Sequence, residues 1–410
     1  MINKIVPSNI NKKKQNLLDF ENFEGILTQK IDLNQISKGE KLVPSNTIGS
    51  AWSGINQKLC NIPLFYYGTQ NGIIVRFSIE KLKQNTTIEE DAQNSLDLQS
   101  SNQQQIDGLQ VIRQLRHEIT RKQKFKIKNF IFQDNKQLNK YDHVLNIKAF
   151  QAFQQNQPCY QVGQVNNCVI LSGKEQNQFQ LKILDENLNL IQTLQNQIAT
   201  QHFTRSSNNI LIFRNTNSYE ECSQILFGKI IDQKLKLLGK QIKFEVRTLF
   251  PTTILADGDF LFVGLYQKKV YVYSIRKRKL IKLINPNIDT YPKKIIYNNN
   301  LEMLVVISLE DQISFINLLS GEVIIQHTLK EIFKKQNIQF SEKFEIFLFN
   351  FVNDDVVLIG GSFNYLFFFE WKTGKILMQY VDSANFVGAI FYKNFIYLTH
   401  EKSGFISIIQ

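Results

Sequence analysis

Few side chains of this chain combine the residue types and spacing that catalysis or metal binding needs. The five histidines and four cysteines show neither HExxH nor CxxC spacing, so no zinc site and no redox dithiol is predicted. No GxxxxGKS/T, GxGxxG or GxSxG string occurs, so the usual phosphate loops and the hydrolase nucleophile elbow lack support. The nearest carboxylate pair, Asp354-Asp355, is interpreted as a solvated turn, because adjacent residues of an extended chain point to opposite sides. We therefore expect no enzymatic activity, no cofactor and no metal.

Basic charge is concentrated in two segments of the chain. There are 48 lysines and arginines against 36 acids, a net charge of +12. Residues 109–148 and residues 268–282 each carry +7, so the remainder is close to neutral. The candidate partner-binding residues of the first segment, which flank an apolar stripe at helical spacing, are Arg113, Arg116, Arg121 and Lys122. Those of the second segment are Lys268, Lys269, Arg276, Lys277, Arg278 and Lys279.

The elements that would position these charges are short strands in a repeated unit. An apolar run ends at a small or turn-forming residue, a polar bend follows, an alternating run resumes, and a third strand closes the unit. The clearest copy runs from Cys168 to Leu194. The second strands of seven copies are predicted at 64–68, 168–173, 210–214, 260–265, 303–308, 356–361 and 395–400. Their third strands are predicted at 73–79, 179–184, 225–231, 270–276, 313–319, 365–371 and 405–409.

The spacing of the copies is typical of four-stranded propeller blades. Successive second strands lie 42, 50, 43, 53 and 39 residues apart after the first step, near the ~40 to 45 residues expected for one blade. The first step is longer because residues 81–142 are interpreted as an insertion, partly disordered and partly helical. A helix predicted at 329–340 explains the step of 53 residues. The prediction is an all-β, seven-bladed β-propeller over residues 25–410, preceded by a flexible tail at 1–24.

A ring of sheets has to close, because open sheet edges promote aggregation. The last copy ends after its third strand, at residues 405–409. The strand-like segment 25–33 matches the fourth-strand position of other copies, such as 375–380. We therefore expect the N-terminal strand to complete the last blade.

The phrases that end the third strands carry a family resemblance. They are Phe369 to Lys375 (FEWKTGK), Ile316 to Glu322 (INLLSGE) and Leu184 to Asn187 (LDEN), with Gly-Lys pairs such as Gly239-Lys240 and Gly374-Lys375 as turns between strands. In these phrases the chain resembles the WD40-like β-propeller family over residues 25–410 apart from the insertion. No copy has a Gly-His opening with a Trp-Asp close, so the His-to-Asp network of WD40 blades is not carried over to any residue. The same turns occur in quinoprotein-type propellers, which stay an alternative.

The basic residues Arg276 to Lys279 fall between the third and fourth strands of a blade, and the insertion occupies the same position in the first blade. If residues 143–150 are the fourth strand of the first blade, the insertion and the 276–279 turn share one rim of the ring. The leading hypothesis is a protein-interaction scaffold that binds acidic protein surfaces within a larger assembly. The alternatives are binding of RNA, indicated by Tyr266, Tyr271 and Tyr273 near the second segment, and a propeller enzyme or ligand binder. The stripe at 109–122 could instead dock on acidic lipid or on the propeller's own rim.

The location is expected from what the sequence does not contain. No N-terminal stretch has signal-peptide character, and no run approaches the ~20 apolar residues of a transmembrane helix. Scattered cysteines favour a reducing compartment. We expect a cytoplasmic protein of a ciliary or cytoskeletal assembly, with the nucleus as an alternative, and nothing in the sequence predicts whether it self-associates.

Overall fold

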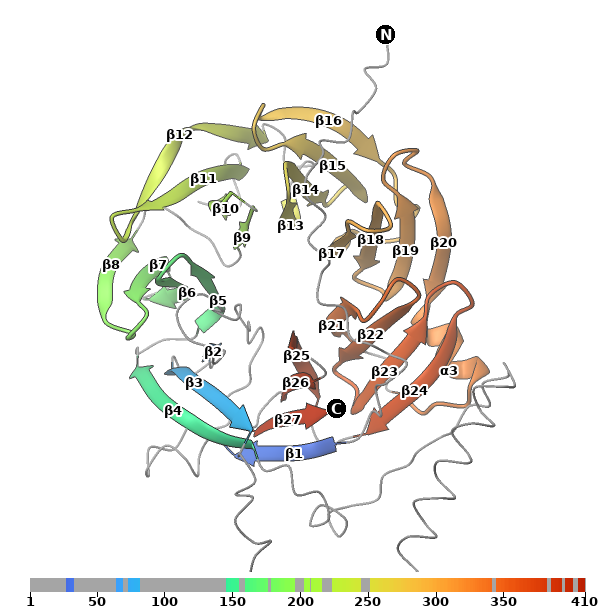
Figure 1. The fold of residues 1–410 in the computed structure, drawn as a ribbon. Coiled ribbons are helices and arrows are strands. Elements are labelled where there is room, and N and C mark those ends of the chain that lie inside the picture. The colour runs from blue at the N-terminus through green and yellow to red at the C-terminus, as the bar shows by residue number, and fades with distance from the viewer. Residues whose placement is uncertain are drawn as a thin grey trace, which may run out of the picture.

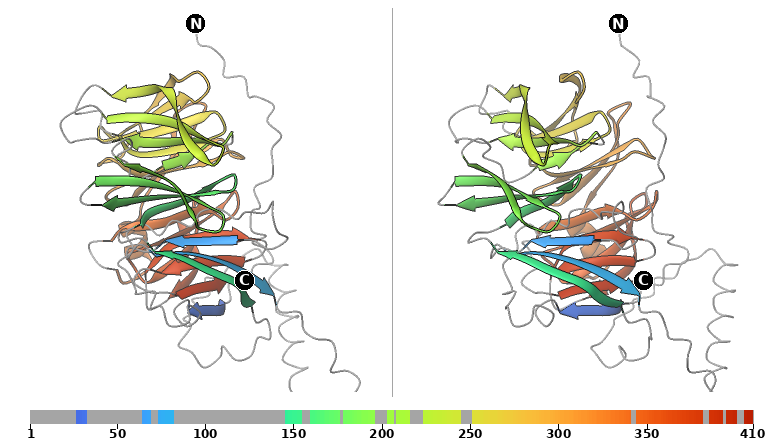
Figure 2. Two further views of the ribbon diagram at one scale, coloured as in Figure 1. Left: turned by 90° about the vertical axis from the view of Figure 1, so that its left-hand side faces the viewer. Right: turned by 60° about the vertical axis from the view of Figure 1, so that its left-hand side comes forward.

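The protein is a β-propeller. The computed structural model describes residues 27–32, 64–68, 73–81, 145–154, 159–175, 178–195, 203–206, 208–215, 223–244, 251–340, 344–381, 385–392, 395–400 and 405–409. They form six four-stranded antiparallel sheets and one three-stranded sheet, arranged around a common centre (Figure 1). Seen from the side, turns line both rims of the ring (Figure 2).

In most sheets the strands run outward from the centre in chain order (Figure 1). The three-stranded sheet holds β2 (Leu64–Gly68), β3 (Ile73–Lys81) and β4 (Leu145–Gln154). The next holds β5 (Cys159–Val165), β6 (Cys168–Glu175), β7 (Gln178–Asp185) and β8 (Leu190–Gln195). It is followed by β9 (Phe203–Arg205), β10 (Ile210–Asn215), β11 (Ser223–Ile231) and β12 (Lys234–Phe244).

The second half of the ring repeats this order. The fourth sheet holds β13 (Pro251–Asp257), β14 (Phe260–Leu265), β15 (Lys269–Ser274) and β16 (Lys279–Ile284). The fifth holds β17 (Pro292–Asn298), β18 (Met303–Ser308), β19 (Gln312–Asn317) and β20 (Val323–Thr328), followed by α3 (Leu329–Lys335). The sixth holds β21 (Ile346–Phe351), β22 (Val356–Gly361), β23 (Tyr365–Glu370) and β24 (Lys375–Val381).

The two ends of the chain share the last sheet, as the sequence predicted. It contains β25 (Phe386–Tyr392), β26 (Phe395–His400), β27 (Phe405–Ile409) and, as its outer strand, β1 (Leu27–Asp32). Pairing of β1 with β27 is antiparallel, from Asp32 opposite Phe405 to Leu27 opposite Ile409. A strand from the start of the chain therefore protects the edge that β27 would otherwise expose.

Six of the predicted blades are complete, and the first is not. The sheet of β2, β3 and β4 has no described strand on the inner side of β2. Its outer strand β4 pairs with β3 as predicted, so residues 82–144 connect the third and fourth strand positions. The structure of those residues, and that of the predicted tail at 1–24, lies outside the described part of the chain.

A β-bulge recurs at the same place in the outer strands. One residue near the start of β4, β8, β16, β20 and β24 has no residue opposite it on the adjacent strand. A bulge bends the strand and interrupts the row of edge groups that another chain could pair with. The five bulged residues are Lys148, Ile191, Ile281, Ile324 and Leu377.

The apolar core lies between neighbouring sheets. Side chains from β17–β20, α3 and β21–β24 form one buried cluster. At its centre Phe333 of α3 is 1% exposed, and its ring lies 5.0 Å from that of Phe367 and 5.5 Å from that of Phe344. Because the sheets diverge outward, large aromatic side chains suit the widening space between them.

Hydrogen bonds also join successive sheets near the centre of the ring. One of these hydrogen bonds comes from Lys294, whose pKa is lowered to about 8 by burial and secondarily by the neighbouring Lys293. The Lys294 Nζ donates to a backbone carbonyl of the next sheet, which is the usual way in which a buried cation is tolerated. The joining pairs are Gln161 with Phe203, Arg214 with Pro251, Thr252 with Pro292, and Lys294 with Phe347.

Two local predictions were wrong. The helix predicted at 329–340 ends at Lys335, because Asn337 adopts a left-handed backbone conformation (φ 56°) just after the cap residue Gln336. The pair Gly239-Lys240 is not a turn but lies inside β12, where the register with β11 shifts. Glycine in a strand often marks such an irregularity. Gly374-Lys375 does form the predicted turn, with Gly374 at φ 73°.

Candidate interaction surface

The second basic segment is divided between the two rims of the ring. Lys268 and Lys269 lie where β14 turns into β15, whereas residues 276–279 lie where β15 turns into β16. The six residues of β15 separate these turns by about 20 Å at ~3.3 Å per residue. The charge of the second basic segment is therefore not gathered in one place. We call the rim with the β14–β15 turn the upper rim and the opposite rim, with the β15–β16 turn, the lower rim.

Residues 276–279 form a firmly held turn, which we call the basic turn. The carboxylate of Asp259, in the adjacent β13–β14 turn, accepts hydrogen bonds from the Ser274 hydroxyl and the Arg276 backbone N–H, both 2.8 Å long. The Ser274 hydroxyl in turn accepts the Lys277 N–H at 3.0 Å. These bonds fix the backbone while Arg276, Lys277 and Lys279 remain exposed to solvent. Three cations are thereby presented on a preorganised support.

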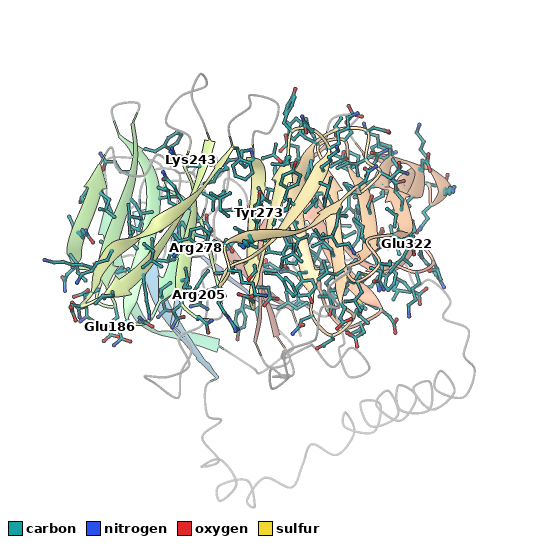
Figure 3. The ribbon with its side chains drawn as sticks, turned by 90° about the horizontal axis from the view of Figure 1, so that it is seen from above. Glu186, Arg205, Lys243, Tyr273, Arg278 and Glu322 are labelled. Atoms are coloured by element: carbon teal, nitrogen blue, oxygen red, sulfur yellow. The ribbon has the colours of Figure 1, made fainter. Side chains whose placement is uncertain are left out.

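Arg278 plays a different part from the other three basic residues. Its backbone is left-handed (φ 49°), a conformation that glycine adopts at the equivalent turn positions Gly321 and Gly374. Its guanidinium carbon lies 4.9 Å from the centre of the Phe227 ring on the neighbouring sheet. Figure 3 shows Arg278 on the outer side of the ring. Arg278 thus anchors the basic turn to the preceding blade by a cation–π contact.

The charge of this turn is not required by the fold. Equivalent turns in other blades hold Glu186 to Asn189, Leu319 to Glu322, and Lys372 to Lys375. Two of these carry one acid and no base, and the third carries two lysines, whereas all four residues of the basic turn are basic. The β15–β16 turn therefore differs from its structural equivalents in charge and not in backbone geometry.

The tyrosines near the second basic segment do not form a common aromatic surface. Tyr273 is buried and Tyr271 partly buried between β9–β12 and β13–β16, and burial raises the pKa of Tyr273 to about 12. Tyr266 alone is well exposed, at 59%, and its ring stacks 5.1 Å from that of Tyr291 on the upper rim. Two of the three tyrosines that suggested base stacking are thus used in packing.

The predicted residues of the first basic segment, Arg113, Arg116, Arg121 and Lys122, lie outside the described residues. The strands that flank this segment are described. β3 and β4 are the third and fourth strands of their blade, as β15 and β16 are of theirs. The chain between β3 and β4 therefore begins at the position in its blade that the basic turn has in the other. The prediction that both segments share the lower rim depends on residues that are not described.

Two histidines and one acidic residue make hydrogen bonds or an ion pair within the described part of the chain. The His327 Nε2 lies 2.6 Å from the Trp371 carbonyl oxygen, and the His400 Nε2 lies 2.7 Å from the Ser407 hydroxyl inside the closing sheet. Asp355 pairs with the Lys372 ammonium at 2.6 Å at the surface. Within the described ranges no group of three or more His, Cys, Asp or Glu could hold a metal. Nor does any described helix have the length and apolarity to cross a bilayer.

One buried acid should make stability depend on pH. Asp311, 3% exposed in the β18–β19 turn, has its pKa raised to about 7, chiefly by burial. The carboxylates of Glu345 and Glu310 add to the rise, and the ammonium groups of Lys293 and Lys330 oppose it. The folded state thus binds this proton more tightly than the unfolded state, so stability falls as pH rises from about 4 to 7.

Asp311→Asn should therefore raise the thermal midpoint by an amount that grows between about pH 4 and pH 7 and is constant above. We expect a difference on the order of 2 kcal/mol at pH 8, since residual solvent near the turn screens part of the effect. Thermal unfolding measured from acid to alkaline pH checks this. Glu310→Gln, which removes only the smallest contribution to the rise of the Asp311 pKa, should show the same trend at a much smaller amplitude. An Asp311→Asn effect that is independent of pH would contradict the assignment.

The comparisons with known proteins add little beyond the fold. No family model and no curated protein matches this sequence. Among solved structures, the crystal structure of BamB from Moraxella catarrhalis is similar at 7% sequence identity and a TM-score of 0.45, covering 85% of this chain and 81% of that chain. The resemblance to WD40-like repeats is thus supported only as far as the β-propeller fold itself, which the sheet topology shows directly.

Proposed function

We propose that this protein is a non-enzymatic scaffold whose lower rim binds an acidic surface of a partner protein. The basic turn is the observation that supports this proposal most strongly. Its four residues are all basic where two of the three equivalent turns carry no basic residue, and its backbone is held by Asp259 without using the charges of Arg276, Lys277 or Lys279. A rigid ring of six four-stranded sheets and one three-stranded sheet would present this turn to a larger assembly.

The test compares partners of matched variants. The basic-turn variant is Arg276→Ala/Lys277→Ala/Lys279→Ala, and its control removes three exposed lysines of another blade, Lys229, Lys234 and Lys236. Each tagged full-length protein is purified from the cells that make it, and bound proteins are quantified by mass spectrometry. We expect a stoichiometric acidic partner that the control retains and the basic-turn variant loses by about fivefold or more. A monomer without a stoichiometric partner would overturn the proposal.

RNA binding is the second candidate, and one observation favours it. The Tyr266 ring, stacked on Tyr291, lies next to Lys268 and Lys269 on the upper rim, where an unpaired base could stack. If RNA binds there, Lys268→Ala/Lys269→Ala should lower the slope of log affinity against log salt by about one per phosphate-contacting lysine. Absence of RNA binding near physiological salt rejects this candidate.

A further inference from the structure

The outer strand β16 exposes apolar side chains directly beside the basic turn. Leu280, Ile281 and Leu283 are 49%, 40% and 48% exposed, and we call them the β16 ridge. On the next sheet Leu319 and Ile324 are 52% and 49% exposed. Half of the large apolar side chains that are exposed in the described residues thus lie on these two neighbouring outer edges. Exposed apolar side chains grouped on one strand mark interaction sites more often than isolated exposed leucines do.

The ridge is not a requirement of the repeat. Leu283 lies opposite Tyr271, two residues after the bulge at Ile281. The other outer strands with the same bulge and described side chains hold polar residues at this position. They are Thr193 in β8, Gln326 in β20 and Gln379 in β24. A leucine here therefore serves something other than the packing of a blade.

The geometry joins the ridge to the basic turn. Leu280 lies opposite Tyr273, so Leu280 and Leu283 project from the same side of the sheet as the two tyrosines. Lys279 comes immediately before Leu280, and the Lys282 Nζ donates to the carbonyls of Leu318 and Leu319 on the next sheet. The edge of the molecule thus carries exposed cations at one end and an apolar strip that continues from them.

We propose that the β16 ridge and the basic turn together bind an acidic amphipathic segment of a partner protein. The apolar side chains of the segment cover the ridge and its carboxylates face the basic turn. This inference rests on the proposed function and adds the partner's chemistry and its place on the blade. Amphipathic segments dock in this way by apolar anchors at regular spacing, with flanking charges that set orientation.

Charge and strand geometry argue against other occupants. The chain's own segment 109–148 carries +7 and would be repelled by the basic turn. Edge-to-edge pairing with a second copy is opposed by the bulge at Ile281, which interrupts the edge of β16. RNA would be held by the cations but would gain little from a strip of leucine and isoleucine.

The test uses two labelled peptides of about 15 residues and the full-length protein. One peptide places leucines at helical spacing among glutamates, and the other is polyglutamate of the same length. We expect the amphipathic peptide to bind more tightly than polyglutamate in fluorescence anisotropy. The ridge variant Leu280→Gln/Leu283→Gln should weaken the amphipathic peptide by about tenfold and leave polyglutamate unchanged. The matched control, Leu190→Gln/Leu237→Gln, removes two leucines of similar exposure from other blades and should change neither affinity.

The outcomes separate this inference from the proposed function. If the ridge variant binds the amphipathic peptide as tightly as the unaltered protein while the basic-turn variant does not, the ridge inference is wrong and the basic turn stands. If neither peptide binds the unaltered protein, both proposals fail. If sedimentation shows a dimer that the ridge variant alone dissociates, the ridge binds a second copy and the acidic partner is excluded.

Discussion

Deletion of residues 1–34 should lower the thermal midpoint by about 10 °C or more and promote association of the protein. The deletion removes β1, whose pairing with β27 runs from Asp32 opposite Phe405 to Leu27 opposite Ile409. Without it β27 becomes an open edge, and the buried side chains of Ile408 and Ile409 (0% and 1% exposed) lose their cover. Burial of each such side chain contributes about 1.5 to 3 kcal/mol, comparable in sum with the stability of a domain.

The closure prediction has two controls. Deletion of residues 1–20 removes polar sequence that precedes β1 and should leave the thermal midpoint nearly unchanged. A synthetic peptide of residues 25–34, added in excess, should restore part of the stability of the longer deletion, because it can occupy the open edge. Thermal unfolding with light scattering measures both stability and association. If the 1–34 deletion melts like the full chain and stays monomeric, the strand does not close the ring in solution.

Trp371→Ala should destabilise the protein by about 3 to 5 kcal/mol, the second-largest effect that we expect. Trp371 is 5% exposed, and its ring stacks 5.0 Å from that of Phe315 on the neighbouring sheet. The Trp371 indole Nε1 donates a hydrogen bond to the Asp354 carbonyl oxygen at 2.8 Å. The backbone carbonyl oxygen of Trp371 lies 2.6 Å from the His327 Nε2. The residue therefore connects two blades by packing and by hydrogen bonds at once.

A conservative variant separates these contributions. Trp371→Phe keeps an aromatic ring against Phe315 but cannot donate to the Asp354 carbonyl, so it should cost about 1 to 3 kcal/mol and less than the alanine variant. Denaturant unfolding gives both values. Equal losses for the two variants would show that the hydrogen bond to the Asp354 carbonyl within the blade, and not the ring packed on Phe315, carries the stabilisation. A loss below about 1 kcal/mol for alanine would mean that the neighbouring side chains refill the space.

Local patterns predicted the strands because the information that specifies them is local. An apolar run such as Met303 to Ser308, which is buried along its whole length, followed by a turn and a second run, forms a hairpin whichever blade contains it. The ring closure was equally accessible, since a propeller that ends after a third strand needs one more strand from elsewhere. The helix after β20 was found from its insertion length but was predicted too long, because Asn337 ends it.

The candidate interaction surface was only partly accessible from sequence. The basic residues were identified by type, and the length of β15 shows how far Lys268 lies from Lys279. Arg278 was counted as a partner-binding cation, and nothing in the order of residues indicated its contact with Phe227 on another blade. The β16 ridge was missed because Leu280 and Leu283 follow the same apolar pattern that buried strands show.

The sequence by itself determined the all-β class, the order of the strands within each sheet and the strand that closes the ring, because alternation, turn residues and repeat spacing act over a few residues to a few tens of residues. Only the tertiary structure decided which strand of each sheet is outermost, on which rim each turn lies and which apolar side chains remain exposed. These properties depend on the packing of a sheet against its neighbours in the ring. Leu283 and Val270 belong to adjacent strands of one sheet, and only the positions of the neighbouring sheets leave the first exposed and bury the second.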